Sequence, residues 1–338
     1  MTATTTPASI EVRNLPYLSA ITEGMAQAMR ADPAVFLAGE DVAGYGSVFG
    51  IFRGLVDEFG SQRVIDTPIA EAGLVGLGVG AAATGCRPVI DIMFMDFFGI
   101  AMDQLVNQAA KMKYMFGGKA TLPLTICTMA GAGMSMAAQH SQSLEAWVCH
   151  VPGLKVVMPS GAYEAKGLLL AAIRENNPVI VVFNKLSLGM TASVPEEPYE
   201  LPLGQAAVLR EGDDVTIVAL GRMVHEALTA ADTLAAEGVS VEVIDPRTLS
   251  PLDTPTLAES VRKTNRAVVV HEAVRFGGFG GEIAAQLQED AFDYLDAPIA
   301  RVGAPFSPVP FSPALEQHYV PNAARIADEV RHVLARTT

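Results

Sequence analysis

The 338-residue sequence has little charge and a shortage of basic side chains. Only 18% of the residues are charged, and 23 basic residues face 37 acidic ones, which gives a net charge of −14. Binding of nucleic acid or of an anionic membrane without sequence specificity needs clustered lysine and arginine. We therefore expect neither nucleic acid nor a membrane among the partners of this chain.

Cysteine is scarce as well. Cys86, Cys127 and Cys149 are too few and too scattered for a disulfide framework, and no pair has metal-ligand spacing. Reduced thiols, no metal site and a cytoplasmic location are the resulting expectations. Residues 1–9 contain no basic residue and no apolar core, so they predict neither a secretory signal nor a transit peptide.

Several motifs of common enzymes are also absent. The chain has no GxSxG sequence of serine hydrolases and no HExxH sequence of zinc proteases. Residues 120–144 carry no charged side chain, which resembles a membrane span. Pro123 and the polar run 139–143 would be costly in hydrocarbon, so we predict a buried segment of a soluble protein instead.

What is abundant is apolar sequence, at 50% of the residues. Short continuous apolar runs are typical of strands that are buried on both faces of a parallel sheet. Such runs occupy 88–92, 122–126, 155–158, 179–183, 215–220, 241–244, 267–271 and 299–302, and helices are predicted at 98–111, 163–174 and 224–237. A segment with three prolines separates the two groups, so we predict an α/β protein with domains at 13–190 and 205–338 and a linker at 191–204.

Two glycine-rich stretches resemble nucleotide-binding loops. The run 76–83 matches GxGxxA, but small residues continue through it, and close packing of a helix explains the glycines more simply. The run 277–281 has no lysine for a phosphate-binding loop and predicts a turn that leads into a helix.

Glu71 stands at the predicted start of the glycine-rich helix. A carboxylate there often does no more than complement the helix dipole. The neighbours of Glu71 are almost all apolar or small, however, so ionisation would be costly. A carboxyl group that stays protonated can donate a hydrogen bond, which makes Glu71 a candidate for chemistry.

The polar run 139–143 is the second candidate site, and it follows the small-residue segment 130–133. Ser141 can cap a helix near Glu145, and His140 can be a core histidine with satisfied hydrogen bonds. Several polar side chains in an uncharged stretch favour a functional loop instead.

A series of ordered motifs over nearly the whole chain resembles one family. The motifs are Glu40-Asp41-Val42, the runs 66–71, 87–89, 103–107, 117–119, 140–143, 152–157 and 165–169, and Asp245-Pro246-Arg247-Thr248-Leu249. Together they are similar to the β subunits of the thiamine-diphosphate-dependent component of 2-oxo acid dehydrogenase complexes.

The resemblance implies a pyrimidine-binding domain with a transketolase-like parallel sheet, followed by a transketolase C-terminal-type α/β domain. It also implies an α2β2 heterotetramer, with thiamine diphosphate between subunits. The α subunit would hold the diphosphate and its Mg2+ through a GDG…N motif, which this chain lacks. A dihydrolipoyl acetyltransferase with its lipoyl domain is the implied acceptor.

The same resemblance assigns roles to individual residues. Glu71 would hydrogen-bond the aminopyrimidine ring nitrogen and so promote formation of the nucleophilic thiazolium carbanion. Ile69 and Phe97 would pack on the pyrimidine, while Met93 stands where relatives often have glutamine. His140 would face the substrate and assist proton or acyl transfer.

Within the family, residues 115–120, 131–134 and 190–196 are most similar to acetoin dehydrogenase β subunits. Many relatives have arginine where this chain has Cys127, and a missing cation near the site would suit neutral acetoin. Pyruvate or branched-chain 2-oxo acids are alternative substrates. A one-chain transketolase-like enzyme and a non-catalytic docking subunit are alternative functions.

Overall fold

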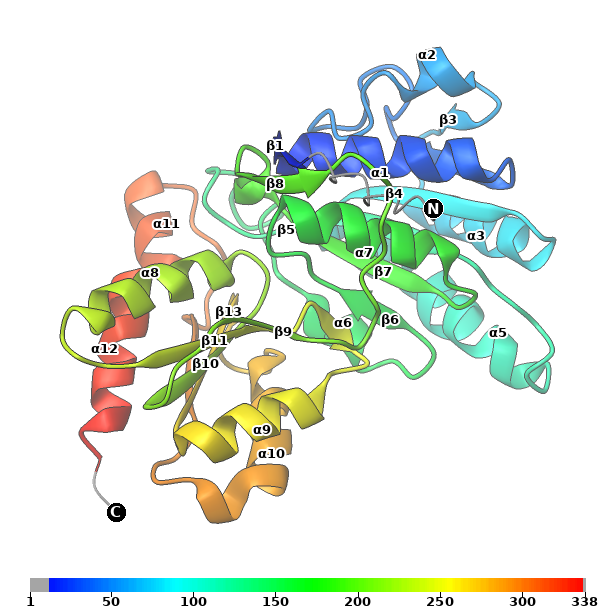
Figure 1. The fold of residues 1–338 in the computed structure, drawn as a ribbon. Helices are drawn as coiled ribbons and strands as arrows, with labels where there is room; N and C mark the ends of the chain where they lie inside the picture. Colours follow the sequence, from blue (N-terminus) through cyan, green and yellow to red (C-terminus); the bar gives the residue numbers. More distant parts are fainter. Residues whose placement is uncertain (1–11, 337–338) are drawn as a thin grey trace, which may run out of the picture.

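Two sheets covered by helices organise the chain, of which the computed structural model describes residues 12–336 (Figure 1). The first strands and helices are β1 (Val12–Pro16), α1 (Tyr17–Ala31), β2 (Val35–Gly39), α2 (Leu55–Phe59), β3 (Val64–Asp66), α3 (Glu71–Ala83), β4 (Arg87–Phe94), α4 (Phe98–Asp103), α5 (Ala110–Met115), β5 (Thr125–Ala130), α6 (Glu145–Cys149), β6 (Lys155–Val157), α7 (Ala162–Arg174), β7 (Val179–Asn184) and β8 (Thr191–Pro195). The remaining ones are β9 (Ala207–Arg210), β10 (Val215–Ala219), α8 (Met223–Ala235), β11 (Val241–Asp245), β12 (Thr248–Ser250), α9 (Thr254–Thr264), β13 (Ala267–Val274), α10 (Gly280–Ala291), β14 (Ala300–Ala304), α11 (Pro313–Tyr319) and α12 (Ala323–Leu334). The predicted α/β class is confirmed.

The first sheet has seven strands in the order β12-β6-β7-β5-β4-β2-β3, all parallel except β12. Every residue of β5 and of β7 is buried, as continuous apolar runs predict for central strands. The predicted strand 122–126 is wrong in its bounds, since β5 begins at Thr125. Pro123 has no N–H to donate to a neighbouring strand, so pairing starts after it.

The predicted helix 98–111 is present but irregular. It runs as α4, a π-helical segment at Gln104–Ala109, and α5, and it ends only at Met115. The helix predicted at 163–174 agrees with α7 within one residue.

The predicted linker is partly a strand. Its first residues form β8, which pairs antiparallel with β1. Lys166, which is fully buried in α7, donates from Nζ to the carbonyl oxygens of Pro195 (2.7 Å) and Glu196 (2.8 Å) and pairs with Glu23 (2.7 Å). The segment between the domains is therefore fastened to the first domain.

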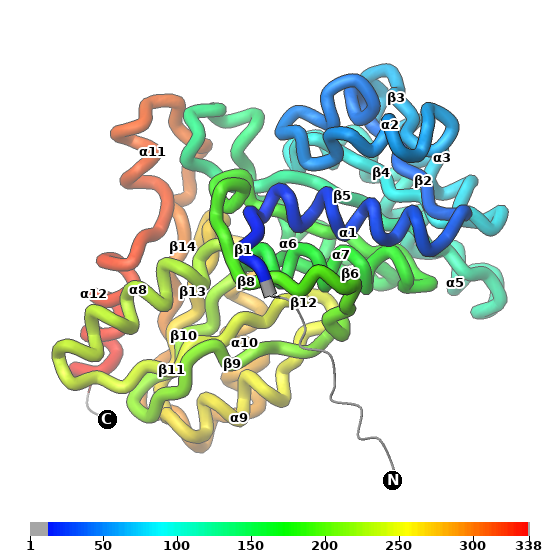
Figure 2. Tube along the Cα trace, turned by 45° about the horizontal axis from the view of Figure 1, so that its top comes forward, coloured from blue at the N-terminus to red at the C-terminus, as the bar shows by residue number. Residues whose placement is uncertain are grey.

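The second sheet has the order β14-β13-β10-β11-β9. Helices α8 and α12 lie on one face and α9 and α10 on the other (Figures 1 and 2). Its outer strand β9 is antiparallel and was not predicted, because it is only four residues long and none of them is buried. Strand β12 from this half of the chain joins the first sheet, so the two halves share a sheet edge.

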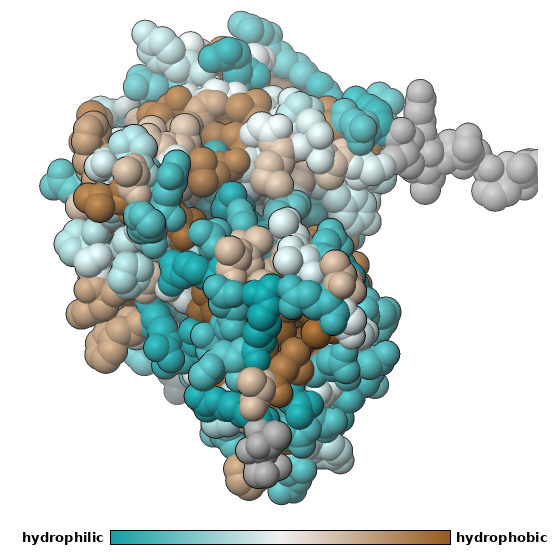
Figure 3. Space-filling model, turned by 90° about the vertical axis from the view of Figure 1, so that its left-hand side faces the viewer, coloured by the Kyte–Doolittle hydropathy of each residue, from teal (hydrophilic) through white to brown (hydrophobic). Residues whose placement is uncertain are grey.

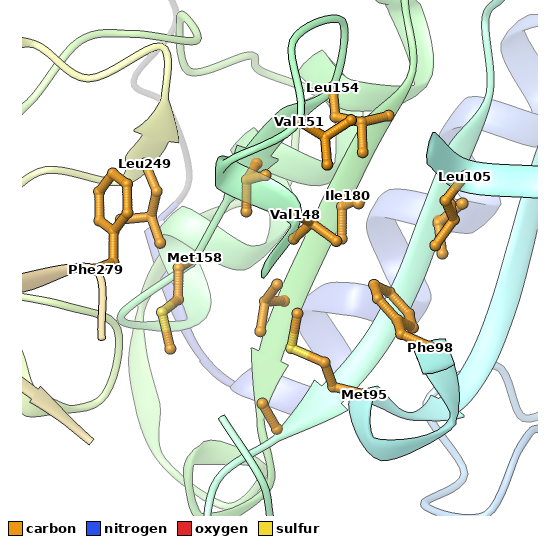
Figure 4. Close-up of a cluster of buried hydrophobic side chains, with 14 of the residues drawn as sticks. Met95, Phe98, Leu105, Val148, Val151, Leu154, Met158, Ile180, Leu249 and Phe279 are labelled. Carbon is orange, nitrogen blue, oxygen red and sulfur yellow. The ribbon is translucent and has the colours of Figure 1, made fainter. Parts of the chain in front are cut away.

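The hydrophobic core continues from one half of the chain to the other. Figure 4 shows Met95, Phe98 and Ile180 of the first domain in the same cluster as Leu249 and Phe279 of the second. A separate cluster between the first sheet and α1 and α7 contains Cys127. The two faces of the first sheet are therefore packed independently, one of them together with the second domain.

Helix α3 confirms the packing interpretation of the glycine-rich run. A Cβ atom on Gly78 would lie 2.7 Å from Cγ1 of Ile90 and 2.9 Å from Cδ1 of Leu124. The run 277–281 leads into α10, as predicted. In the part of the chain that the structure describes, the three cysteines are free and no helix is both long and apolar enough to cross a membrane. Residues 1–9, predicted to lack a signal, lie outside the described residues.

Candidate active site

The carboxyl ends of β2, β3 and β4 meet at one edge of the first sheet. The three strands are parallel, and Gly39 at the end of β2 is paired with Asp66 on one side and with Asp91 on the other. Glu40 follows β2 directly. Ligands of open parallel sheets bind outside this edge, so acidic side chains gather where a ligand is expected.

Glu71 begins α3 at this edge, and its side chain is buried, with only 5% exposure. Its carboxyl group has no hydrogen-bond partner in the described part of the chain, which leaves it free to bind a ligand. Glu40 is equally buried, and burial together with the nearby charge of Glu71 raises the pKa of Glu40. Two carboxyl groups therefore share one enclosed region.

Asp91, within β4, is 2% exposed, and like Cys127, its partner on β5, it lies on the face of the first sheet that packs against α1 and α7. Ser47 donates a hydrogen bond from Oγ to Oδ2 of Asp91 at 2.6 Å. Burial raises the pKa of Asp91 to about 7, and the charge of Glu40 adds to this effect. Asp91 is thus part of the packed interior rather than an accessible ligand.

His140 belongs to a second group of side chains, formed by the loop after β5. Its ring packs edge-on against Phe94 (4.8 Å between centroids) and Phe97 (5.4 Å). The backbone carbonyl of His140 accepts a hydrogen bond from Nζ of Lys185. The ring itself is half-buried and has no hydrogen-bond partner among residues 12–336, so the alternative of a hydrogen-bonded core histidine is wrong.

The loop is fixed further by Asp96, which follows β4. Its Oδ1 accepts hydrogen bonds from the backbone N–H (3.2 Å) and the side-chain Nε2 (2.9 Å) of Gln142. Ser141 does not cap a helix, because α6 has Leu144 at its N-cap and Oγ of Ser141 is buried without a partner in the described residues.

Lys185 connects the second group to the first sheet. It stands directly after β7, is 2% exposed, and its Nζ lies 5.4 Å from the ring centroid of Phe94. Burial lowers the pKa of Lys185 to about 8, although the charges of Asp96, Glu272 and Glu316 oppose the shift. A buried amine with this pKa is a candidate proton donor beside His140.

The predicted site residues thus fall into two groups. Phe97 contacts His140, whereas Ile69, two residues before Glu71, is 81% exposed. Met93 is half-buried near the end of β4. In the described part of the chain no hydrogen bond or ring contact joins Glu71 to His140, so any direct link between the groups must come from a ligand that contacts both.

The chain has close relatives among known proteins. Residues 13–191 match the family "Transketolase, pyrimidine binding domain", and residues 204–326 match "Transketolase, C-terminal domain". Over 334 residues the chain is 49% identical to the acetoin:2,6-dichlorophenolindophenol oxidoreductase subunit beta of Bacillus subtilis, covering 95% of this chain and 98% of the relative. The chain belongs to the transketolase-type β-subunit family.

Other members of this family are similar over the same length. The pyruvate dehydrogenase E1 component subunit beta of Rhizobium meliloti is 45% identical over 328 residues, which are 97% of this chain and 71% of the relative. A solved structure described as "Split gene transketolase, inactive beta4 tetramer" has a TM-score of 0.80 at 25% identity, covering 96% of this chain and 99% of that one. The predicted family is confirmed. The prediction that the chain is a subunit of a thiamine-diphosphate-dependent oxidoreductase is confirmed with it.

One prediction about this family member is wrong. Cys127 is fully buried on β5, opposite Asp91, in the cluster that faces α1 and α7. Helix α3, which carries Glu71, packs on the other face of the sheet. A cysteine at position 127 therefore does not alter the charge around a ligand at Glu71, and it carries no information about the substrate.

Sequence reasoning assigned no role to Glu40 or Lys185. Both stand immediately after a strand of the parallel sheet, which is the signal that would have found them. Glu272 and Glu316 were also missed, and no local pattern reveals them, because they reach the loop of His140 from the second domain.

Proposed function

We propose that this chain is the β subunit of an acetoin dehydrogenase, which cleaves acetoin to acetaldehyde and an acetyl unit. Acetoin is favoured as the substrate because the sequence identity to acetoin oxidoreductase β subunits, at 49% and 48%, exceeds that to the pyruvate dehydrogenase β subunit of Rhizobium meliloti, at 45%. The acetyl unit passes to the disulfide of a lipoyl group on a dihydrolipoyl acetyltransferase. Oxidation of the two-carbon fragment is thus balanced by reduction of that disulfide to one thioester and one thiol.

The residues around Glu71 fit the aminopyrimidine of thiamine diphosphate. Glu71 offers a buried carboxyl group without a protein partner in the described part of the chain, and Ile69 beside it and Phe97 from the His140 group offer apolar surface for a flat ring. When bound, the cofactor supplies a nucleophilic carbon that adds to a carbonyl group. The carboxyl group of Glu71 would lie beside the ring nitrogen, where it can exchange a proton with it.

His140 would act on the substrate side. Its ring packs edge-on against Phe94 and Phe97, and neither ring nitrogen has a hydrogen-bond partner in the described part of the chain. We assign it proton transfer to the reacting oxygen during acyl transfer. Lys185, which binds the carbonyl oxygen of His140, orients the loop.

An α subunit completes the site in this proposal, as an α2β2 assembly. The chain has no GDG sequence to hold a diphosphate and its Mg2+. Large apolar side chains are exposed at Tyr114 (88%), Met115 (59%) and Phe116 (58%). Hydrophobic patches also interrupt the hydrophilic surface in Figure 3. Exposed apolar surface of this kind is typical of a protein interface.

The substrate is tested by co-expression with the α subunit and comparison of acetoin, pyruvate and branched-chain 2-oxo acids as substrates. We expect kcat/KM for acetoin to exceed that for each 2-oxo acid by at least about tenfold, a difference of about 1.4 kcal/mol. Activity with 2-oxo acids alone would contradict the substrate but leave the family chemistry in place. A one-chain transketolase-like enzyme would instead be active without the α subunit.

A further inference from the structure

The loop that carries His140 is attached to the second domain. This loop, residues 131–144, follows β5 and is here named the His140 segment. We propose that Glu316, together with Glu272, is a positioning residue that holds the His140 segment in its active geometry. The proposal rests on the role of His140 in the proposed function, and it adds that the second domain controls that role.

Glu316 lies in α11 and is only 2% exposed. Its Oε1 accepts a hydrogen bond from the backbone N–H of Gly133 at 2.5 Å, and its Oε2 accepts one from the backbone N–H of Ser135 at 2.9 Å. Both oxygens of one carboxylate are thus used on two N–H groups of the same turn. An ionised acceptor makes such bonds stronger than neutral ones.

Glu272 binds the beginning of the same segment. It stands on β13, is 3% exposed, and its Oε1 accepts a hydrogen bond from the backbone N–H of Ala132 at 2.6 Å. Its Oε2 accepts one from Nδ2 of Asn184 at 2.8 Å. Asn184 in turn accepts a hydrogen bond from the N–H of Leu186, which fixes the turn that carries Lys185.

The far end of the His140 segment is bound by that same turn, because Lys185 donates to the carbonyl of His140. Glu272 and Glu316 therefore act on the segment in two ways. Both bind its first backbone N–H groups directly, and Glu272 also fixes, through Asn184, the turn that holds His140 itself.

The backbone of the segment needs such support. Ser135 and Ala137 have φ values of 54° and 58°, in the left-handed region that non-glycine residues rarely adopt. The segment has neither helix nor strand to stabilise this conformation. A strained conformation persists only when contacts around it determine it, and the described contacts of the first turn come from the second domain.

The first test measures hydrogen exchange of the holoenzyme assembled with its α subunit. Glu316→Gln keeps the size of the side chain but replaces one acceptor oxygen with an NH2 group, which cannot accept from a backbone N–H. We expect amides of residues 131–144 to exchange about tenfold faster or more, while those of β5 stay unchanged. Unchanged exchange in the segment would overturn the proposal.

The matched control is Glu164→Gln. Glu164 also joins the two halves of the chain, through Arg247 at 2.9 Å, but it does not touch the His140 segment. We expect this variant to leave exchange in residues 131–144 and acyl transfer to the lipoyl group within about twofold of the wild type. If both variants lowered acyl transfer equally, Glu316 would only join the domains and the proposal would be wrong.

The second test is a double-mutant cycle between Glu316→Gln and His140→Ala. Alone, Glu316→Gln should lower kcat for acyl transfer about 10- to 100-fold, as expected for a lost charged hydrogen bond, with the KM for acetoin within about twofold. In the His140→Ala background it should cost no more than about twofold, because the residue being positioned is gone. Additive losses would overturn the proposal.

The two tests separate this proposal from the proposed function. If His140→Ala alone left acyl transfer unchanged, the catalytic assignment of His140 would fail and the positioning role with it. Faster exchange in Glu316→Gln would then describe only a structural contact. A second variant, Glu272→Gln, repeats both measurements should Glu316→Gln not fold.

Discussion

The two halves of the candidate site are held in place in different ways. The Glu71 half, formed by Glu40 and Glu71, is built from a strand end and a helix start within one domain. The N–H of Leu74 donates to the carbonyl oxygen of Ala70 at 2.8 Å, so α3 itself fixes the first turn that carries Glu71. The His140 segment contains no helix or strand, and besides Asp96 and Lys185 of the first domain it is held by two carboxylates from the second domain.

This difference separates a rigid part of the site from an adjustable one. The backbone that carries Glu71 cannot shift without disrupting the first turn of α3. The His140 segment keeps its conformation through side chains of both domains, Glu272 and Glu316 at its start and Lys185 at His140. Cofactor activation would therefore depend on one helix start, whereas substrate handling would depend on contacts between the domains.

The largest expected effect comes from Glu71→Gln, which tests the rigid half. An amide cannot hold and release a proton at the cofactor ring, so we expect turnover to fall about 10²- to 10⁴-fold, the range for loss of general acid–base catalysis. Assembly and Tm should stay close to the wild type. The measurement is kcat of the complex with the α subunit.

Its control is Ser47→Ala, on the other face of the same sheet. The hydroxyl of Ser47 donates to Asp91 and is assigned no role toward a ligand, so turnover should change less than about tenfold. Near-normal activity of Glu71→Gln would remove Glu71 from the chemistry. It would also favour the alternative of a non-catalytic docking subunit.

The second prediction concerns the start of the His140 half. Gly131 has φ of 98°, and a Cβ atom there would lie 2.5 Å from Nδ2 of Asn184 and 2.8 Å from Oε1 of Glu272. Gly131→Ala should lower the free energy of unfolding by about 3 kcal/mol, from backbone strain and overpacking together. Chemical denaturation measures this loss.

Gly85→Ala is the matched variant, since Gly85 has φ of 102° and nothing within 4 Å of the added Cβ atom. Gly85→Ala should lower the free energy of unfolding by about 1 kcal/mol, because only the backbone conformation is strained. Equal losses in the two variants would mean that the contact with the second domain contributes nothing, and the two halves of the site would then be held alike.

The Glu71 half was accessible from sequence because it is encoded locally. A carboxylate among small residues, at the start of a helix that follows a turn, is visible in six consecutive residues. The buried strands β4 and β7 were equally visible as apolar runs. What was missed depends on pairing at a distance: β12 joins a sheet of the other domain, and Glu316 lies 183 residues from Gly133.

The third prediction concerns the pH dependence of stability that arises from Asp91, on the face of the sheet behind the Glu71 half. Burial raises the pKa of Asp91 from its ordinary 3.8 to about 7, so the folded state binds more protons between these values. Stability should therefore fall as the pH rises from about 4 to about 7. Asp91→Asn removes this loss, so its free energy of unfolding relative to the wild type should grow by about 4 kcal/mol over that range.

Urea denaturation at several pH values measures this difference. Burial also raises the pKa values of Glu145 and Asp245 to about 7, so the stability of Asp91→Asn still depends on pH through these two groups. Asp245→Asn is the comparison from the second domain. An Asp91→Asn curve parallel to the wild type at all pH values would mean that Asp91 is not buried as described.

The smallest expected effect comes from Cys127→Ala, which tests whether β5 beneath the His140 segment affects the substrate. Cys127 is fully buried between Asp91 and Val181 on the face of α1 and α7, so the variant should lose about 1 kcal/mol of stability. The ratio of kcat/KM for acetoin to that for pyruvate should not change beyond about twofold. A larger change would mean that the two faces of the sheet are coupled, and that substrate choice reaches the site through β5 rather than through the segment held by the second domain.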